Sequence, residues 1–126
     1  MTEIDHSIVT DIGLTTIRVR GAVRVEPLAE ALLHLAHQGP TLHLLWDFTS
    51  ADLSTLRERQ LSQLVFVARQ HAHHRRGGKT AMLVGSDFDF GMARMIATLS
   101  DQHEQMVEYR IFRCADTATA WLEGRG

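Results

Sequence analysis

Two nearly continuous apolar segments, residues 41–48 (TLHLLWDF) and 80–84 (TAMLV), constrain the fold of this chain most strongly. A strand that is apolar on both faces has to be covered on both faces, which is typical of the centre of a parallel sheet. Segments with apolar residues at helical spacing precede and follow each of them. The chain is therefore expected to fold as an α/β protein.

The first forty residues predict two strands and a helix. Residues 4–9 and 15–20 alternate apolar and polar side chains around a turn with Gly13, which indicates an antiparallel strand pair. A helix is expected to begin near Pro27, because proline is tolerated in the first helical turn. Gly39 and the proline after it end this helix.

The later elements alternate between helix and strand. Thr55 followed by Glu58 fits a capping box, so a long helix is expected from there to a cationic end before Gly77. A further helix should begin near Asp87 or Asp89, a strand should cover residues 109–112, and Asp116 should cap a last helix.

This order predicts one domain over residues 1–126, with an antiparallel strand pair leading into a mostly parallel five-stranded sheet and about four helices. The net charge of −2 gives no broad positive field, so no nucleic-acid partner is expected. A single cysteine excludes an internal disulfide and a cysteine-based zinc site. The acidic N-terminus and the lack of a long apolar run favour a cytoplasmic location.

The stretch Gly77-Gly78-Lys79-Thr80 invites comparison with a nucleotide-binding loop. Such a loop needs a further glycine at residue 73, which is a histidine, and it leaves a strand to enter a helix. The glycines here leave a helix and enter a strand, so they are interpreted as a helix stop. No cofactor is expected.

The histidines at positions 71, 73 and 74 raise the question of a metal site. On a helix, side chains at i, i+2 and i+3 do not converge on one ion as side chains at i and i+4 do. A solvated, cationic helix end is the preferred interpretation, and no metal site is expected.

Ligands of parallel α/β sheets bind at the carboxyl ends of the strands, so this edge supplies the candidate site. Ten residues at these strand ends and in the loops beyond them are predicted to bind a ligand or a partner: Asp47, Thr49, Asp52, Ser54, Ser86, Asp87, Phe88, Asp89, Phe90 and Met92.

The candidate residues have three interpretations. The carboxylates of Asp47, Asp87 and Asp89 could hold a metal ion for hydrolysis. Phe88, Phe90 and Met92 could line a pocket for an apolar ligand, or they could be plain core. As an alternative to metal binding, Asp52, Asp87, Asp89 and Asp116 could be helix caps, which is the favoured interpretation because each of them precedes a helix.

The segments GGKTA (77–81), GSDFDFGMARM (85–95), YRIFR (109–113) and AWL (120–122) resemble small bacterial proteins of the STAS/SpoIIAA-like (CRAL-TRIO-like) family, distant relatives of the sporulation anti-sigma-factor antagonist. The resemblance implies the fold of that antagonist and a non-enzymatic domain. It also implies binding of a protein partner or a small lipophilic molecule, with membrane association in some members.

The antagonists in this family carry a phosphorylatable serine at the start of the helix after the third strand. The corresponding stretch is Asp52-Leu53-Ser54-Thr55, which makes Ser54 the candidate phosphoacceptor, although the second serine and the glycine of the family's sequence are absent. Part of a helix cap is the other interpretation of Ser54.

Three functions follow, in order of preference. The first is a regulatory or protein-interaction module that acts through residues 47–55 and the helix after them. The second is a carrier or sensor of a small apolar ligand, and the third is a metal-assisted hydrolase. Phe66 and Val67 lie away from the main apolar stripe of their predicted helix and could form a homodimer face.

Overall fold

The computed structural model describes residues 2–9, 12–39, 41–101 and 107–125, without the side chains of residues 6–9, 88 and 99–101. The strands of this part of the chain are β1 Glu3–Val9, β2 Leu14–Ala22, β3 His43–Asp52, β4 Lys79–Leu83 and β5 Glu108–Phe112. Its helices are α1 Val25–Gln38, α2 Glu58–Gln70, the 3-10 helix η2 Ala72–Arg75, α3 Asp87–Asp101 and α4 Ala115–Leu122.

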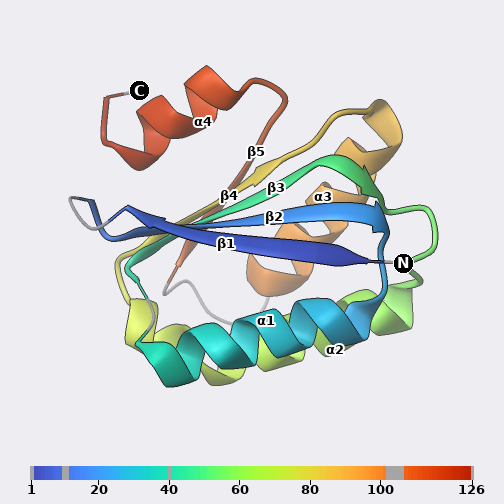
Figure 1. Ribbon diagram of the computed structural model, residues 1–126, viewed down its shortest axis with the longest axis horizontal. Helices are drawn as coiled ribbons and strands as arrows, with labels where there is room; N and C mark the ends of the chain where they lie inside the picture. Colours follow the sequence, from blue (N-terminus) through green and yellow to red (C-terminus); the bar gives the residue numbers. More distant parts are fainter. Residues whose placement is uncertain (1, 10–11, 40, 102–106, 126) are drawn as a thin grey trace.

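The strands form one five-stranded sheet in the order β1-β2-β3-β4-β5. β1 pairs with β2 in antiparallel orientation, and every later pair is parallel. The predicted antiparallel pair and mostly parallel sheet are thereby confirmed. Because the parallel strands point the same way, their carboxyl ends meet at one edge of the sheet, on the right in Figure 1.

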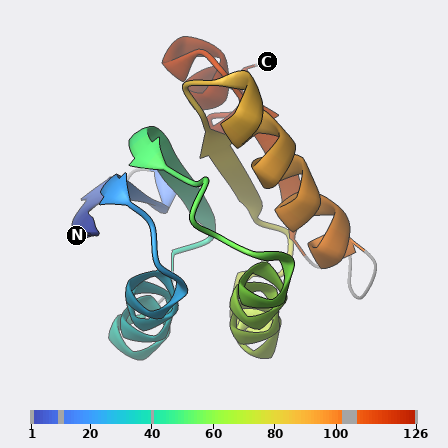
Figure 2. The same cartoon turned by 90° about the vertical axis from the view of Figure 1, so that its right-hand side faces the viewer.

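The helices cover the two faces of the sheet unequally. α1 and α2 lie side by side below the sheet and α3 lies beside it, whereas α4 packs above it (Figures 1 and 2). The large core lies between the sheet and the first three helices, and it includes Phe48, Leu61 and Ile96. Within this core the rings of Trp46 and Phe48 stack at 5.6 Å between centroids.

α4 covers only one end of the other face, over the smaller core cluster. Ala81 of β4 is buried there against Trp121 and Leu122. Lys79 fixes the end of this helix, because its Nζ donates a hydrogen bond of 2.7 Å to the carbonyl oxygen of Trp121. The lysine beside the glycine pair therefore has a structural partner at the carboxyl end of a helix, where cations are favoured.

Several boundaries differ from those predicted. β3 was expected at residues 41–48, but it runs to Asp52 because its last residues pair with β2, as far as Ala22 opposite Asp52. Asp47 and Thr49 therefore lie within the strand rather than at its end.

Among the described residues, no helix is both long enough and apolar enough to cross a membrane.

The predicted capping box at Thr55 is wrong. α2 begins at Glu58, and the Oε1 atom of Gln60 accepts a hydrogen bond of 2.9 Å from the backbone N–H of Arg57. The hydroxyl of Thr55 instead donates to the carbonyl oxygen of Val23 at 2.6 Å. Thr55 therefore ties the β3–α2 connection to the segment between β2 and α1.

Candidate functional site

A shallow depression of about 360 Å³ opens at the carboxyl edge of the sheet. It arises because β3 extends beyond β4: the last register pair of these strands joins Asp47 to Leu83, whereas β3 continues to Asp52. The depression is lined by Thr49, Ala51, Asp52, Ser54, Gly85, Ser86 and Asp89. Five of the ten predicted site residues therefore lie together: Thr49, Asp52, Ser54, Ser86 and Asp89.

Gly85 lets the two sides of the depression approach each other. A Cβ atom at this position would lie 3.2 Å from the carbonyl oxygen of Thr49, which is closer than ordinary van der Waals contact. A residue with a side chain would therefore push the end of β3 away from the β4–α3 connection.

Ser54 stands on a tight turn directly after β3. The Oδ1 atom of Asp52 accepts a hydrogen bond of 2.9 Å from the backbone N–H of Ser54 and one of 2.5 Å from its hydroxyl. These two bonds lower the pKa of Asp52, with the hydroxyl bond as the larger cause. Both residues are exposed. The turn thus presents a serine hydroxyl to solvent in a fixed position.

Ser86 and Asp89 form the opposite wall. The Oγ atom of Ser86 accepts a hydrogen bond of 3.1 Å from the backbone N–H of Asp89, so Ser86 caps α3. The prediction that Asp87 or Asp89 caps this helix is therefore wrong. Asp89 lies in the first turn with 7% of its surface exposed, and its negative charge there suits the positive end of the helix dipole.

The depression is acidic. Asp52 and Asp89 supply two carboxylates, and none of the described lining residues is cationic. An anionic ligand would be repelled by these two carboxylates, and no cationic side chain among the described lining residues would neutralise its charge. The site therefore favours a neutral or cationic group, such as the surface of a partner protein that carries basic side chains.

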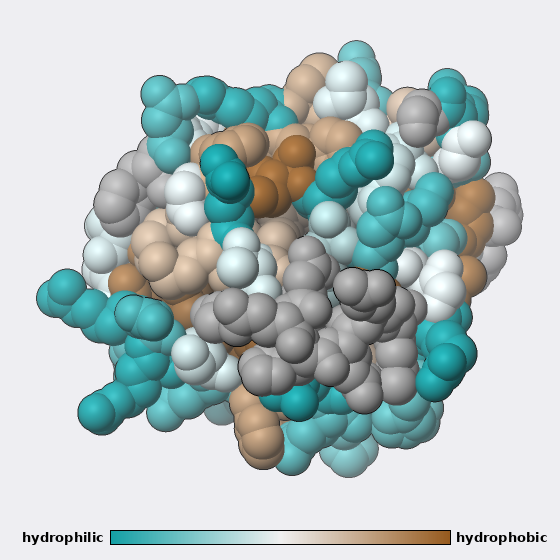
Figure 3. Space-filling view, turned by 180° about the vertical axis from the view of Figure 1, so that it is seen from behind, coloured by the Kyte–Doolittle hydropathy of each residue, from teal (hydrophilic) through white to brown (hydrophobic). Residues whose placement is uncertain are grey.

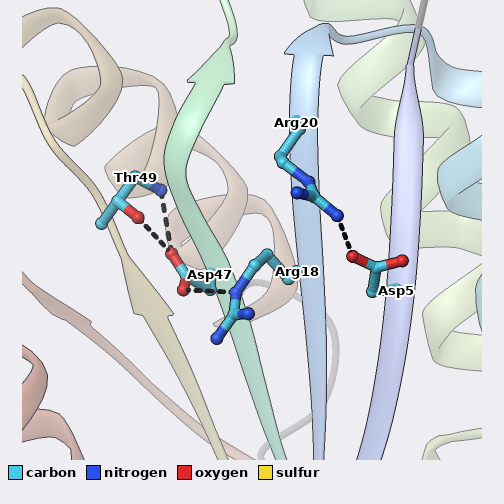
Figure 4. A network of polar contacts seen from close by, with 5 residues as sticks. All are labelled: Asp5, Arg18, Arg20, Asp47 and Thr49. Atoms are coloured by element: carbon cyan, nitrogen blue, oxygen red, sulfur yellow. Dashed lines mark hydrogen bonds and ion pairs between the residues drawn. The ribbon is translucent and has the colours of Figure 1, made fainter.

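Asp47 belongs to a different network, on the open face of the sheet (Figure 4). Its Oδ1 atom accepts hydrogen bonds from the hydroxyl (2.6 Å) and the backbone N–H (3.0 Å) of Thr49. Its Oδ2 atom lies 3.3 Å from Nε of Arg18. Burial raises the pKa of Asp47, but the bonds from Thr49 and Arg18 outweigh it, so the pKa is lowered.

The other predicted residues point elsewhere. Asp87 has 92% of its side chain exposed and pairs with Arg113 at the end of β5. Phe90 and Met92 are partly buried against the large core, and the side chain of Phe88 lies outside the described residues. The three carboxylates of the metal hypothesis are thus separate, and no group of metal-ligating residues forms among those described.

Two small, partly open cavities lie between the sheet and the helices below it. Their volumes are about 40 and 30 Å³. Pockets for drug-sized ligands measure roughly 300–1,000 Å³. Among the described residues, these two cavities therefore have room for a few atoms rather than for a lipid-sized molecule.

Arg75 is buried, which the sequence did not predict. Sequence reasoning placed it in a solvated cationic segment, yet only 9% of its surface is exposed. It lines both cavities. The only signal in the sequence is its place just before the glycine pair, which returns the chain sharply to the sheet.

The sequence itself matches no family model and no curated protein. The structure, in contrast, matches an anti-sigma factor antagonist from Mycobacterium paratuberculosis with a TM-score of 0.68 at 13% identity, covering 98% of this chain and 95% of that one. The chain has a SpoIIAA-like fold. This confirms the fold that the sequence segments suggested.

Two further structures share this SpoIIAA-like fold. One is an uncharacterised protein of the DUF3478 family from Shewanella loihica, with a TM-score of 0.65, 15% identity and coverage of 96% of this chain and 93% of that one. The other is the anti-sigma factor antagonist SpoIIAA in its unphosphorylated form, with a TM-score of 0.58, 15% identity and coverage of 98% and 99%. At such low identity the likeness concerns the fold.

Proposed function

We propose that this protein is a non-enzymatic regulatory domain that binds a partner protein through the β3–α2 turn and the exposed face of α2. The observation that carries the proposal is the turn of Ser54, whose hydroxyl is exposed and held by Asp52 at the rim of the acidic depression. A rigid exposed turn beside a depression is suited to recognition because binding it costs little ordering entropy.

α2 adds an apolar anchor to this surface. Phe66 is 58% exposed, more than any other large hydrophobic side chain among the described residues, and lies on the polar side of the helix between Ser62 and Arg69. Aromatic side chains surrounded by polar ones are typical centres of protein–protein interfaces. The exposed face of α2 is therefore proposed as the second half of the contact.

The similar structures support one class of partner. Two of them are anti-sigma factor antagonists, so an anti-sigma factor is the partner class we propose for this chain. On the surface seen from behind, hydrophobic side chains lie among hydrophilic ones (Figure 3).

Ser54 is the proposed point of regulation. A phosphate on its hydroxyl would break the bond to Asp52 and bring two negative charges beside that carboxylate. The repulsion would open the turn and disturb a contact made through it. Incubation with a cognate serine kinase should add one phosphate, and a Ser54→Ala variant should take up none. An unchanged mass of the wild-type protein would remove this part of the proposal.

The binding surface can be tested by titrating purified anti-sigma factors against matched variants. Ser54→Asp and Phe66→Ala should each weaken binding at least tenfold. Thr98→Asp and Met95→Ala, on exposed positions of α3, make comparable changes outside the proposed surface and should bind like wild type. Equal losses in both sets, or no saturable binding by any anti-sigma factor, would refute the proposal.

Binding of a small lipophilic ligand beside Phe90 and Met92 stays a second prediction. It requires those side chains to move from the core against which they are partly buried. Native mass spectrometry of protein taken directly from cells tests it, because a retained ligand would add a defined mass. A clean mass of the chain alone would count against it.

A further inference from the structure

A buried arginine that forms no ion pair with the described carboxylates lies at the amino end of β4, away from the acidic depression at the carboxyl ends of the strands. Arg75 is more than nine-tenths buried, and its Nη2 atom donates to the carbonyl oxygen of Lys79 at 3.0 Å and to the hydroxyl oxygen of Thr80 at 2.9 Å. Its Nε atom has no hydrogen-bond partner, the one such buried side-chain nitrogen or oxygen in the described part of the chain.

No ion pair joins Arg75 to a carboxylate among the described residues. Burial lowers the pKa of Arg75, but a guanidinium remains charged at neutral pH. A Coulombic contribution from Tyr109 raises the pKa of Arg75, but it is smaller than the effect of burial. His43, at the same end of the sheet, has a lowered pKa because of burial and of the charges of Lys79 and Arg75.

The two small cavities lie beside the side chain of Arg75. Arg75 lines both internal cavities, and so do Leu32, Leu44, Ala68 and Tyr109. Apart from Arg75, Thr80 and Tyr109, the cavity of about 40 Å³ is walled by apolar side chains. A water molecule fits this volume and would satisfy the Nε–H donor, yet it would leave the buried positive charge uncompensated.

We propose that a small monovalent oxyanion, of the size of formate, nitrate or acetate, binds beside Arg75 in this cavity. The anion accepts a hydrogen bond from Nε–H, and such charge-assisted bonds are stronger than neutral ones. Its single negative charge matches the single positive charge of the Arg75 guanidinium. A divalent anion such as sulfate would carry a second charge into apolar surroundings, which is strongly unfavourable.

This inference is independent of the proposed partner contact. The contact is made by the exposed turn of Ser54 and the exposed face of α2, whereas Arg75 is buried and bonds to Lys79 and Thr80 at the amino end of β4. The anion would act on the stability of the fold, because a ligand that binds only the folded state lowers the population of the unfolded one.

Unfolding of the full chain in urea tests the proposal at constant ionic strength, with sodium formate replacing sodium sulfate. Sulfate stabilises folded proteins in general, so Arg75→Met should show only the general effect of exchanging the two salts. Relative to that effect, formate at ten times its dissociation constant should lower the unfolding equilibrium constant of wild type about elevenfold. Arg76→Met removes the neighbouring exposed cation and should respond like wild type. An equal response of Arg75→Met and wild type would overturn the assignment.

A second measurement does not depend on whether Arg75→Met folds. The Nε–H group of Arg75 is buried, so its side-chain signal should be visible in ¹H–¹⁵N spectra of wild type. Titration with formate should shift this signal saturably, and sulfate at the same ionic strength should not. If neither anion moves the signal and stability depends on ionic strength alone, the cavity holds water only and the proposal is wrong.

Discussion

Gly77 and Gly78 stand side by side between η2 and β4, yet the structure requires glycine at the two positions for different reasons. Gly77 has a φ of +85°, a conformation that L side chains rarely adopt, and no atom lies within 4 Å of a Cβ built there. Gly78 has no positive φ. A Cβ at this position would lie 2.0 Å from the carbonyl oxygen of Leu42 and 2.9 Å from that of Arg75.

These different surroundings predict different losses of stability when each glycine is replaced by alanine. In Gly77→Ala, the left-handed backbone conformation lowers the free energy of unfolding by roughly 1–2 kcal/mol. Alanine also restricts the unfolded chain, which raises the free energy of unfolding by roughly 0.4–1 kcal/mol. A net loss of about 1 kcal/mol is expected. Gly78→Ala forces a methyl group against backbone atoms that cannot rotate away, so a loss of about 3 kcal/mol or more is expected, at the upper end of overpacking effects.

Urea unfolding followed by circular dichroism measures both losses. Gly91→Ala is the matched control, because Gly91 lies inside α3 with open space around its Cβ position and should gain about 0.5–1 kcal/mol. The expected order of stability is therefore Gly91→Ala, wild type, Gly77→Ala, Gly78→Ala. Equal losses at Gly77 and Gly78, or a loss at Gly78 below that at Gly77, would refute the reasoning.

Two further predictions concern polar contacts. Because the pKa of Asp47 is lowered, its contribution to stability is present above its unfolded pKa of about 3.8 and is lost as the pH falls through the folded value. Asp47→Asn should therefore cost about 1 kcal/mol at pH 7, and urea titrations should show the difference from wild type vanishing at low pH. Thr55→Val removes the donor to the carbonyl oxygen of Val23 and should also cost about 1 kcal/mol in urea unfolding. A pH-independent difference at Asp47, or a neutral Thr55→Val, would contradict these assignments.

The sheet could be predicted from the sequence because its signals are local. The apolar runs around Leu44 and Met82 and the helical stripes between them fix which segments are strands and which are helices. The end of β3 could not be predicted. It depends on the extended partner that β2 offers as far as Ala22, and this pairing between distant segments leaves no local pattern.

The candidate site could be predicted in part. The rule that ligands bind at the carboxyl ends of parallel strands correctly gathers Ser54 and Ser86 at one depression. It also included Asp47 and Asp87, whose side chains turn to Arg18 and Arg113 instead. The direction of a side chain at a strand end depends on the partner that tertiary structure brings near, which the spacing of residues does not record.

The burial of Arg75 could not be predicted from the sequence. Arginine is mostly exposed in proteins, and the cationic residues around Arg75 predict a segment that is exposed to solvent. It is buried because the glycines after η2 return the chain directly into β4, where Gly78 N–H donates to the carbonyl oxygen of Arg75 at 2.8 Å. This tight connection draws the guanidinium under the sheet.

Site-specific photo-crosslinking in cells tests most directly whether the Ser54 turn and α2 form the partner surface. Replacing Ser54 or Phe66 by p-benzoylphenylalanine should give adducts with one and the same anti-sigma factor. The same replacement at Gln38, exposed at the end of α1, should give none. Adducts of that protein at Gln38 alone, or adducts at Ser54 and Phe66 formed only with a second copy of this chain, would contradict the account.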